Sequence, residues 1–303
     1  MIDQVPTSDV AFRAWAAPPG SSSSQMLQAK QAKQTDEMKG SPGNNRIRPT
    51  WMHPKIWLPP LVAMAVLTVA WQLYADHNPF VIPTVQKIFG SLGDRPGFYL
   101  RNALTTVQEA LVGAACGMGI AFILAVVMSY VRVVERAVLP LAVILNVTPI
   151  IAVAPALVVA FGFGMTPKYI ISSVLVFFPF LINALTGLRS VDPLALDLMD
   201  TLHASRSEIL WKLRLPSSLP FLFAAARICM PLSLIGAVVA EFVAPGTSNG
   251  LGTLIVTASS VSDLQTIYAS VVVLAFLGIT LFLLVIFIQS RVLTWHSSQK
   301  VRD

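Results

Sequence analysis

Residues 267–288 read IYASVVVLAFLGITLFLLVIFI, and this stretch decides the fold of the chain. It contains no charged residue, and it is longer than the roughly 20 residues that a helix needs to cross the hydrocarbon core of a bilayer. A strand fits poorly because the stretch is too long and shows no alternation of apolar and polar side chains. The stretch therefore predicts a transmembrane helix.

Five further apolar runs of similar length lie earlier in the chain, at residues 56–74, 107–131, 137–161, 169–188 and 221–243. Of the 303 residues, 55% are apolar and only 12% are charged. A soluble domain typically has about 25% charged residues, so these proportions exclude a soluble enzyme. We expect an all-α membrane protein in which residues 51–303 form one domain of about six transmembrane helices.

The first 50 residues differ in composition from the rest of the chain. They contain a serine run at residues 21–24 and a polar stretch at residues 25–39, with few large apolar side chains. Such a segment cannot bury enough apolar surface to offset its loss of conformational entropy. It also lacks the apolar core of a signal peptide. We expect residues 1–50 to form a disordered tail on the cytoplasmic side.

The positions of the basic residues predict the topology. Seven of the 21 Lys and Arg residues precede residue 56, and four more lie in the connector at residues 189–220. The connectors on the opposite side contain only Lys87, Arg95, Arg101 and Lys168. Because cytoplasmic loops carry an excess of Lys and Arg, both termini are predicted to be cytoplasmic. This topology accounts for the net charge of +6, and nucleic acid is not expected as a partner.

Small residues and cysteines inside the apolar runs indicate packing rather than chemistry. Gly113 and Gly117 have the small-xxx-small spacing that lets two helices approach closely. We expect them to pack within the chain, with a subunit contact as the alternative. Cys116 and Cys229 lie in apolar runs, so we expect two buried thiols. No group of Cys and His has metal-ligand spacing, and no metal site is expected.

The connector at residues 189–220 begins with a helix start. Asp192 can cap a helix whose first residue is Pro193. Leu194, Leu198 and Leu202 then recur at i, i+4 and i+8, which predicts a short amphipathic helix. A loop lying on the lipid headgroups is an open alternative for this segment.

A second helix start follows at Ser205-Arg206-Ser207-Glu208, which has the spacing of a capping box. We expect this second helix to end near Leu215-Pro216, because proline removes a hydrogen-bond donor. The connector therefore predicts a pair of short helices bounded by proline.

This connector resembles the EAA loop of ATP-binding-cassette importer permeases. That motif reads E-A-A, three residues, G, nine residues, I-x-L-P. The corresponding positions here hold Asp197-Leu198-Met199, then His203, then Leu213-Arg214-Leu215-Pro216. The sequence departs from the motif at Asp197, at Leu198 and Met199, and at His203, which stands where the motif has glycine.

Further segments are similar to the nitrate/sulfonate/taurine branch of these permeases, and they occur in the same order. They lie at residues 148–155, 161–164, 202–206, 215–220, 240–242 and 250–252. The phrase Phe177-Phe178-Pro179, followed by Gly187-Leu188-Arg189, is also similar to permeases of thiamine precursors and riboflavin.

The resemblance implies a multi-pass subunit of a type I importer in the inner membrane, which is not itself an enzyme. Two permease subunits, expected as a homodimer, would form the pathway, and an extracytoplasmic solute-binding protein would deliver the solute. Separate cytosolic ATPases would bind the ATP, with no cofactor in this chain. The residues that the resemblance places at the ATPase contact are Asp197, His203, Ala204, Ser205, Arg206, Glu208, Leu215 and Pro216.

Four residues are candidates for the translocation pathway. Asn146 and Pro149 interrupt an apolar run, Asn183 lies in the next run, and Glu241 lies near the outer end of the fifth. Irregular backbone and ionisable groups at membrane depth are tolerated where protein or a water-filled cavity satisfies them. A proline kink for packing, and a capping role for Glu241 in the loop at 246–252, are the alternatives.

Two other charged residues lie in apolar runs. Glu109 is expected to reach water near the outer surface, and Arg227 is expected to extend to the inner interface. The alternative function is an ATP-independent carrier or channel, which would show polar relays or paired broken helices. A membrane enzyme is a third class of function, but the sequence contains no recognisable set of catalytic residues that would support it.

Overall fold

Helices make up nearly all of the chain that the computed structural model describes, residues 54–244 and 249–293. The chain divides into two compact units, residues 1–57 and residues 58–303. The predicted tail, residues 1–50, lies outside the described residues and stays a prediction. No strand occurs in the two described ranges, which agrees with the predicted all-α fold.

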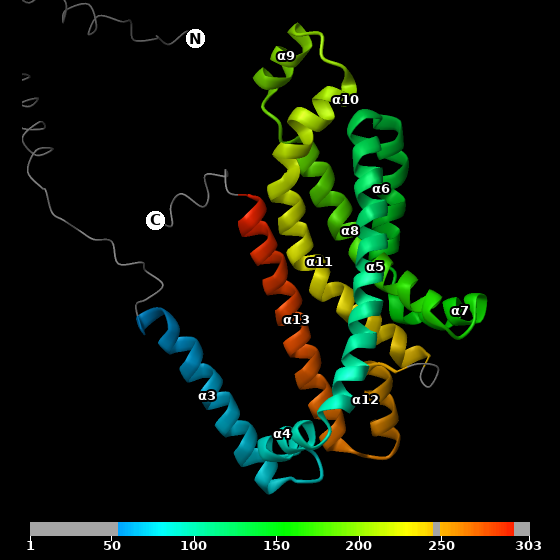
Figure 1. The fold of residues 1–303 in the computed structure, drawn as a ribbon. Coiled ribbons are helices and arrows are strands. Elements are labelled where there is room, and N and C mark those ends of the chain that lie inside the picture. Colours follow the sequence, from blue (N-terminus) through cyan, green and yellow to red (C-terminus); the bar gives the residue numbers. More distant parts are fainter. Residues whose placement is uncertain (1–53, 245–248, 294–303) are drawn as a thin grey trace, which may run out of the picture. The chain divides into compact units, whose positions relative to one another are not determined.

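The described helices follow one another with short connections (Figure 1). They are α3 (Pro54–His77), α4 (Val85–Asp94), α5 (Pro96–Tyr130), α6 (Arg132–Val147), α7 (Ile150–Phe161), α8 (Met165–Arg189), α9 (Pro193–Thr201), α10 (Arg206–Ile209), the π-helical segment η2 (Leu210–Arg214), α11 (Leu215–Val243), α12 (Leu251–Ser260) and α13 (Leu264–Val292).

Among the described residues, five helical segments are long and apolar enough to cross a membrane. They are Leu58–His77, Pro96–Tyr130, Met165–Arg189, Arg206–Val243 and Leu264–Val292. The run at residues 137–161, which the sequence predicts as one span, is instead divided between α6 and α7, whose axes meet at 98°. The part of the chain that the structure describes therefore has five continuous candidate spans and one broken pair.

The break between α6 and α7 has a local cause at Thr148-Pro149. Proline disfavours the helical conformation in the residue before it, and Thr148 is extended, with φ −66° and ψ 124°. The Thr148 hydroxyl donates to the Ile144 carbonyl at 2.7 Å, which satisfies a carbonyl at the end of α6. Gly162, with φ +79°, ends α7 in a conformation that favours glycine. The short α7 is thus bounded by residues suited to a sharp change of direction.

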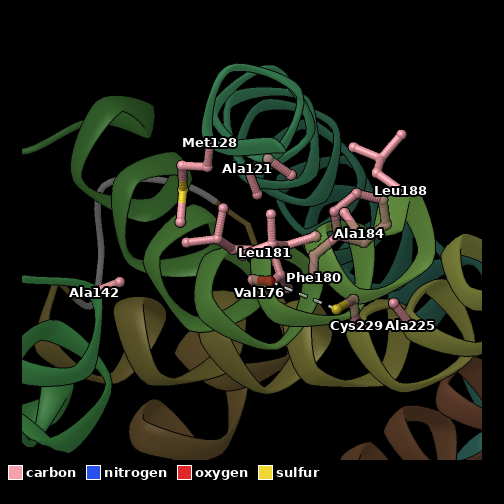
Figure 2. Close-up of a cluster of buried hydrophobic side chains, with 12 residues drawn as sticks. Ala121, Met128, Ala142, Val176, Phe180, Leu181, Ala184, Leu188, Ala225 and Cys229 are labelled. Carbon is pink, nitrogen blue, oxygen red and sulfur yellow. Dashed lines mark hydrogen bonds between the residues drawn. The ribbon is translucent and has the colours of Figure 1, made fainter. Parts of the chain in front are cut away.

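The largest buried cluster lies where α5, α8 and α11 pack together, with Ala142 contributed by α6 (Figure 2). Leu181, Met128 and Val176 are fully buried among alanines such as Ala121, and the Cys229 thiol donates to the Val176 carbonyl at 3.6 Å. Lipid tails are as apolar as leucine, so close packing holds such helices together rather than exclusion of water. The many alanines permit that packing.

The small residues of α5 lie against α8, as predicted for packing within the chain. The Ser173 hydroxyl donates to the Gly113 carbonyl at 2.9 Å. A Cβ atom at Gly113 would overlap Ser172, and one at Gly117 would lie 2.6 Å from Val176 Cγ2. The neighbouring Cys116 is exposed on α5, so the prediction of two buried thiols is wrong for it and correct for Cys229. The α5 face that carries Gly113 and Gly117 packs on α8, and Cys116 lies off that face.

Candidate functional site

The connector between α8 and α11 forms two short helices at one end of the spanning helices (Figure 1). Asp192 caps α9 as predicted, because its carboxylate accepts a hydrogen bond from the Leu194 amide at 3.0 Å. The predicted leucine stripe of α9 is present and faces outward. Leu194, Leu198 and Leu202 are 76%, 60% and 66% exposed. An apolar stripe on a polar connector is thus free to contact another surface.

The turn between α9 and α10 has left-handed backbone at His203, where φ is +54°. The His203 amide donates to the Asp200 carbonyl at 3.0 Å, and the Ala204 amide donates to the Met199 carbonyl at 3.0 Å. This pair of bonds is the Schellman arrangement, whose left-handed position glycine usually occupies. The backbone therefore explains why the EAA motif has glycine at this position, and histidine keeps the same turn.

The capping box at the start of α10 is present as predicted. The Ser205 hydroxyl accepts from the Glu208 amide at 3.3 Å, and the Glu208 carboxylate accepts from the Ser205 amide at 3.0 Å. Lys212 adds an ion pair to Glu208 at 3.0 Å. The first turn of α10 is thus closed by its own side chains.

The predicted helix end at Leu215-Pro216 is wrong. The backbone continues from α10 through η2 into α11, and Pro216 lies in the first turn of α11. Proline in a continuous helix removes one hydrogen bond to the preceding turn and crowds that turn with its ring, and the turn before Pro216 is the π-helical segment, where the helix departs from α geometry. The connector is therefore joined to a membrane-spanning helix by uninterrupted helical backbone.

Arg189, the last residue of α8, joins the connector to the ends of α5 and α6. Its guanidinium donates two hydrogen bonds to the Glu135 carboxylate, at 2.7 and 2.6 Å. A third bond, at 3.0 Å, goes to the Met128 carbonyl near the C-terminus of α5. A cation at this position also interacts favourably with the helix dipole of α5.

Arg214 joins the other end of the connector to the same turn of α5. Its guanidinium donates to the Ser129 carbonyl at 3.2 Å and lies over the Tyr130 ring at 4.7 Å from the centroid. The Tyr130 hydroxyl in turn donates to the Arg206 carbonyl at 2.9 Å. Both ends of the connector are therefore attached to the C-terminal turn of α5. Sequence reasoning counted Arg189 and Arg214 for the topology and quoted them within family-like segments, but it assigned neither of them a contact.

The residues predicted to contact an ATPase all lie on this connector. Asp197, His203, Ser205, Arg206 and Glu208 are exposed. Ala204, Leu215 and Pro216 are half-buried, because they lie where the connector turns and where it meets α11. The structure thus places the eight residues along one continuous segment.

A second polar group lies at the opposite end of the helices, around Glu241 of α11. Its carboxylate is fully buried, accepts a 2.7 Å hydrogen bond from the Thr106 hydroxyl of α5, and also accepts from the backbone amides of Gly252 and Thr253. These amides belong to the first turn of α12, where a negative charge is stabilising. The predicted capping alternative for Glu241 is therefore present in the geometry.

Two α5 side chains complete the attachment of α12. The Gly250 amide donates to Asn102 Oδ1 at 2.9 Å, and the Leu251 amide donates to the Thr106 hydroxyl at 2.8 Å. Gly252 permits the close approach, since a Cβ atom there would lie 2.6 Å from Glu241 Oε2 and 2.9 Å from the Val238 carbonyl. The first turn of α12 is thus held by side chains of α5 and α11.

Glu109 of α5 does not reach water, which corrects the sequence prediction. It forms an ion pair with Lys168 of α8 at 2.7 Å, and both side chains are at most 1% exposed. Lys168, counted from the sequence as a connector residue, lies in the first turn of α8 and is fully buried. A buried ion pair needs a partner from another helix, so one apolar run by itself does not reveal it.

The four predicted pathway residues occupy separate places. Asn146 is exposed near the end of α6, and Pro149 lies at the break before α7. Asn183 is half-buried on α8, where its amide donates to the Pro179 carbonyl of the same helix at 2.8 Å. Within the described residues, no hydrogen bond joins any two of these three residues or joins one of them to Glu241.

These features define a multi-pass α-helical membrane protein whose spanning helices are joined firmly to an exposed pair of short helices at one end. Comparison with known proteins adds the family. Residues 117–294 match the family model described as binding-protein-dependent transport system inner membrane component. The matched segment contains the end of α5 and all of α6 to α13, so it includes the connector described above.

Three relatives extend the match over most of the chain. A probable ABC transporter permease of Haemophilus influenzae is 32% identical over 74% of this chain and 92% of its own length. A riboflavin transport system permease of Chloroflexus aurantiacus is 30% identical over 81% and 92%. The taurine transport system permease of Escherichia coli is 27% identical over 77% and 88%. The chain belongs to the family of ABC transporter permeases, which are transport proteins and not enzymes.

Proposed function

We propose that this permease is the transmembrane subunit of an ATP-driven type I importer and that the connector at 189–220 couples it to a separate ATPase. The observation that carries this proposal is the leucine stripe of α9. Leu194, Leu198 and Leu202 expose their side chains on a polar connector, away from the apolar spans. Exposed contiguous apolar side chains on a polar segment are typical of a protein contact.

The attachment of the connector supports a mechanical role for it. Arg189 and Arg214 bind carbonyl groups of consecutive residues in α5, and α10 continues into α11 without a break. A displacement of α9 and α10 by an ATPase would therefore be passed to α5, α8 and α11 together. Rigid-body movement of this kind produces alternating access in transporters.

The partners and the solute follow from the family as proposals. A second copy of the chain would complete the pathway, and an extracytoplasmic solute-binding protein would deliver a small solute. The relatives named above transport riboflavin and taurine. We propose a solute of the nitrate, sulfonate or taurine type, or of the thiamine-precursor or riboflavin type. The connector and both termini would lie in the cytoplasm, where the partner ATPase binds ATP.

The leucine stripe is tested by two variants that introduce the same residue on opposite faces of α9. Leu198→Asn removes the central apolar contact, whereas Asp200→Asn alters the other face of the same helix. We expect Leu198→Asn to lose co-purification of the ATPase and Asp200→Asn to retain it. Equal co-purification in both variants would contradict docking through the stripe.

Coupling itself is tested at Ala204 and Ser205, where the chain turns between α9 and α10. A bulky charged residue such as Arg at either position is expected to separate ATP hydrolysis from uptake while the spanning helices stay folded. Uptake measured beside ATP hydrolysis in proteoliposomes gives the result. Normal uptake with a normally bound ATPase would overturn the coupling role, and uptake in the absence of any ATPase would favour an independent carrier.

The pathway residues need a separate uptake experiment. Asn146→Ala and Asn183→Ala each remove a side-chain amide without changing the bounds of a helix. We expect reduced uptake if these amides line the pathway. Unchanged uptake in both variants would remove them as pathway residues.

A further inference from the structure

Arg227 carries a positive charge inside a membrane-spanning helix. It is the thirteenth residue of α11, about 18 Å along the axis from the first. Its Nε atom is buried, and the guanidinium forms no hydrogen bond or ion pair with any residue in the described ranges. A charge at membrane depth is costly and usually has a partner. The partner of Arg227 is therefore to be sought outside the described chain.

The helix that packs against this part of α11 carries a second buried polar atom without a hydrogen-bond partner among the described residues. Oε1 of Gln289, on α13, is buried and has no hydrogen-bond partner among the described residues. The two helices run in opposite directions (Figure 1), and a Cβ atom at Gly278 would contact Leu234 at 3.8 Å. Relative to this contact between Gly278 and Leu234, Arg227 and Gln289 both lie toward the connector end of their helices.

The directions of the two side chains reduce the distance between Arg227 and Gln289 along the helix axes. Arg227 is seven residues from Leu234, and Gln289 is eleven residues from Gly278, a difference of about 6 Å along the axes. Helical side chains lean toward the N-terminus of their own helix. For α11 that direction is toward the connector, so the long Arg227 side chain covers most of the difference.

An apolar groove runs along the same faces of α11 and α13. Its volume is about 490 Å³, and all of its lining residues are apolar or glycine, among them Pro231, Leu234, Leu274, Ala275 and Gly278. Arg227, Pro231 and Leu234 recur at i, i+4 and i+7, so the charge lies in line with the groove at its inner end. The surface thus combines an apolar groove with a cation, at one end, that has no partner among the described residues.

We propose that this groove binds an anionic phospholipid of the inner leaflet, with an acyl chain along α11 and α13 and the phosphate on Arg227. An acyl chain matches the apolar lining, and an arginine matches a phosphate by charge-assisted, bidentate hydrogen bonds. Gln289 can add a contact to the polar headgroup. The choice of the inner leaflet rests on the cytoplasmic orientation proposed above for the connector, and the proposal does not depend on the coupling role of the connector.

A helix from a second copy of the chain fits this surface less well, because it offers no anion at the required depth. Among the described residues of the spanning segments, Asp76, Glu135 and Glu208 lie in the first or last turn of a segment, and the remaining acidic side chains are Glu109 and Glu241. Both are fully buried at the opposite end of the helices from the connector. An anionic lipid, by contrast, supplies both the charge and the apolar chain.

Native mass spectrometry of the full chain purified in detergent tests the proposal. The lipids are dioleoyl phosphatidylglycerol and dioleoyl phosphatidylcholine, and inorganic phosphate serves as the headgroup without a chain. We expect one phosphatidylglycerol molecule to be retained more tightly than phosphatidylcholine, and Arg227→Gln to weaken this retention about tenfold. Arg291→Gln is the matched control, since Arg291 lies in the last turn of α13 over the Phe287 ring.

A second variant approaches the groove from the lipid side. Ala275 is exposed, so Ala275→Trp fills the groove without entering the buried core. We expect it to reduce phosphatidylglycerol retention while Arg227 is intact. Equal retention of both lipids, equal retention by Arg227→Gln and wild type, or binding of inorganic phosphate as tight as that of the lipid would each overturn the proposal. A variant that loses a second subunit while it retains lipid as the wild type does would assign the groove to contact with another copy of the chain and would overturn the proposal too.

Discussion

The charged side chains that join the spanning helices are partly accessible at one end and fully buried at the other. At the connector end, Arg189 and Arg214 are partly accessible and bind carbonyl groups at the C-terminus of α5. At the other end, Glu109, Lys168 and Glu241 are sealed from solvent and join α5, α8, α11 and α12. The difference suggests that one end is built for contact with a partner and the other for a fixed arrangement of helices.

The largest expected effect is at the buried ion pair. Glu109→Leu removes the 2.7 Å ion pair between Glu109 and the Lys168 ammonium. Removing one partner of a buried pair typically costs about 3–5 kcal/mol. We expect a large loss of thermal stability in detergent, with part of it recovered in Glu109→Leu/Lys168→Leu, where the charge is removed as well. Equal melting temperatures for the single variant and wild type would show that the pair does not hold this end.

The attachment of α12 comes next. Glu241→Ala removes the acceptor used by the Thr106 hydroxyl and by the amides of Gly252 and Thr253. Buried donors left without a partner cost about 1–3 kcal/mol each. Hydrogen exchange is expected to increase in α12 and to remain unchanged in α9. Glu241→Gln, which keeps one carbonyl oxygen, should lose less stability than Glu241→Ala.

Breaking the attachment at the connector end should cost less stability. Arg189→Gln removes a bidentate pair with Glu135 that is partly open to solvent, so about 1 kcal/mol is expected. The consequence for motion should be larger, because the connector loses one of its two attachments to α5. Hydrogen exchange in α9 and α10 measures it. Lys212→Gln, which breaks an exposed pair within the connector, is the control.

The turn at His203 offers a gain of stability at the same end. His203 has φ +54°, which costs residues other than glycine about 1 kcal/mol. His203→Gly is therefore expected to raise the melting temperature slightly, less the entropy that glycine adds to the unfolded chain. Ala204→Gly, at the next residue, is expected to give no such gain. A lower melting temperature for His203→Gly would mean that the imidazole contributes more than the strain costs.

The smallest effect is at the cap of α13, at the end of the helices opposite the connector. Asp263 accepts from the Thr266 hydroxyl at 2.6 Å and from the Thr266 amide at 3.1 Å, and these hydrogen bonds lower the pKa of its carboxyl. A lowered folded-state pKa adds stability above the unfolded pKa, and this stability is lost as the pH falls through the folded pKa. Asp263→Asn keeps a capping side chain, so it should cost only a few tenths of a kcal/mol. Melting temperatures compared between neutral and acidic pH should differ less in Asp263→Asn than in wild type.

Local signals predicted the connector well. The Asp192 cap, the leucine stripe and the Ser205–Glu208 capping box involve residues within a few positions of one another, so spacing alone reveals them. The helix end at Leu215-Pro216 was predicted wrongly because proline can be accommodated in a continuous helix where the preceding turn is π-helical. Proline can end a helix or lie within one, and the conformation of the backbone before it decides which of the two occurs.

Contacts between distant residues could not be predicted in the same way. Glu109 and Lys168 are 59 residues apart, and Thr106 and Glu241 are 135 apart. A single charge in an apolar run is compatible with exposure at the interface, with snorkelling and with a buried pair. Only the packing of α5 against α8 and α11 selects the buried pair.

The apolar stretch at 267–288, the scarcity of charge and the spacing of the connector determined by themselves that this chain is a helical membrane protein with short helices between two spans. These properties depend on the length of apolar runs and on neighbouring residues. The tertiary structure alone decided which charges are buried, where the connector is attached and which cation has no partner within residues 54–244 and 249–293. Those outcomes depend on the balance between the cost of desolvating a charge and the partner that another helix brings to it.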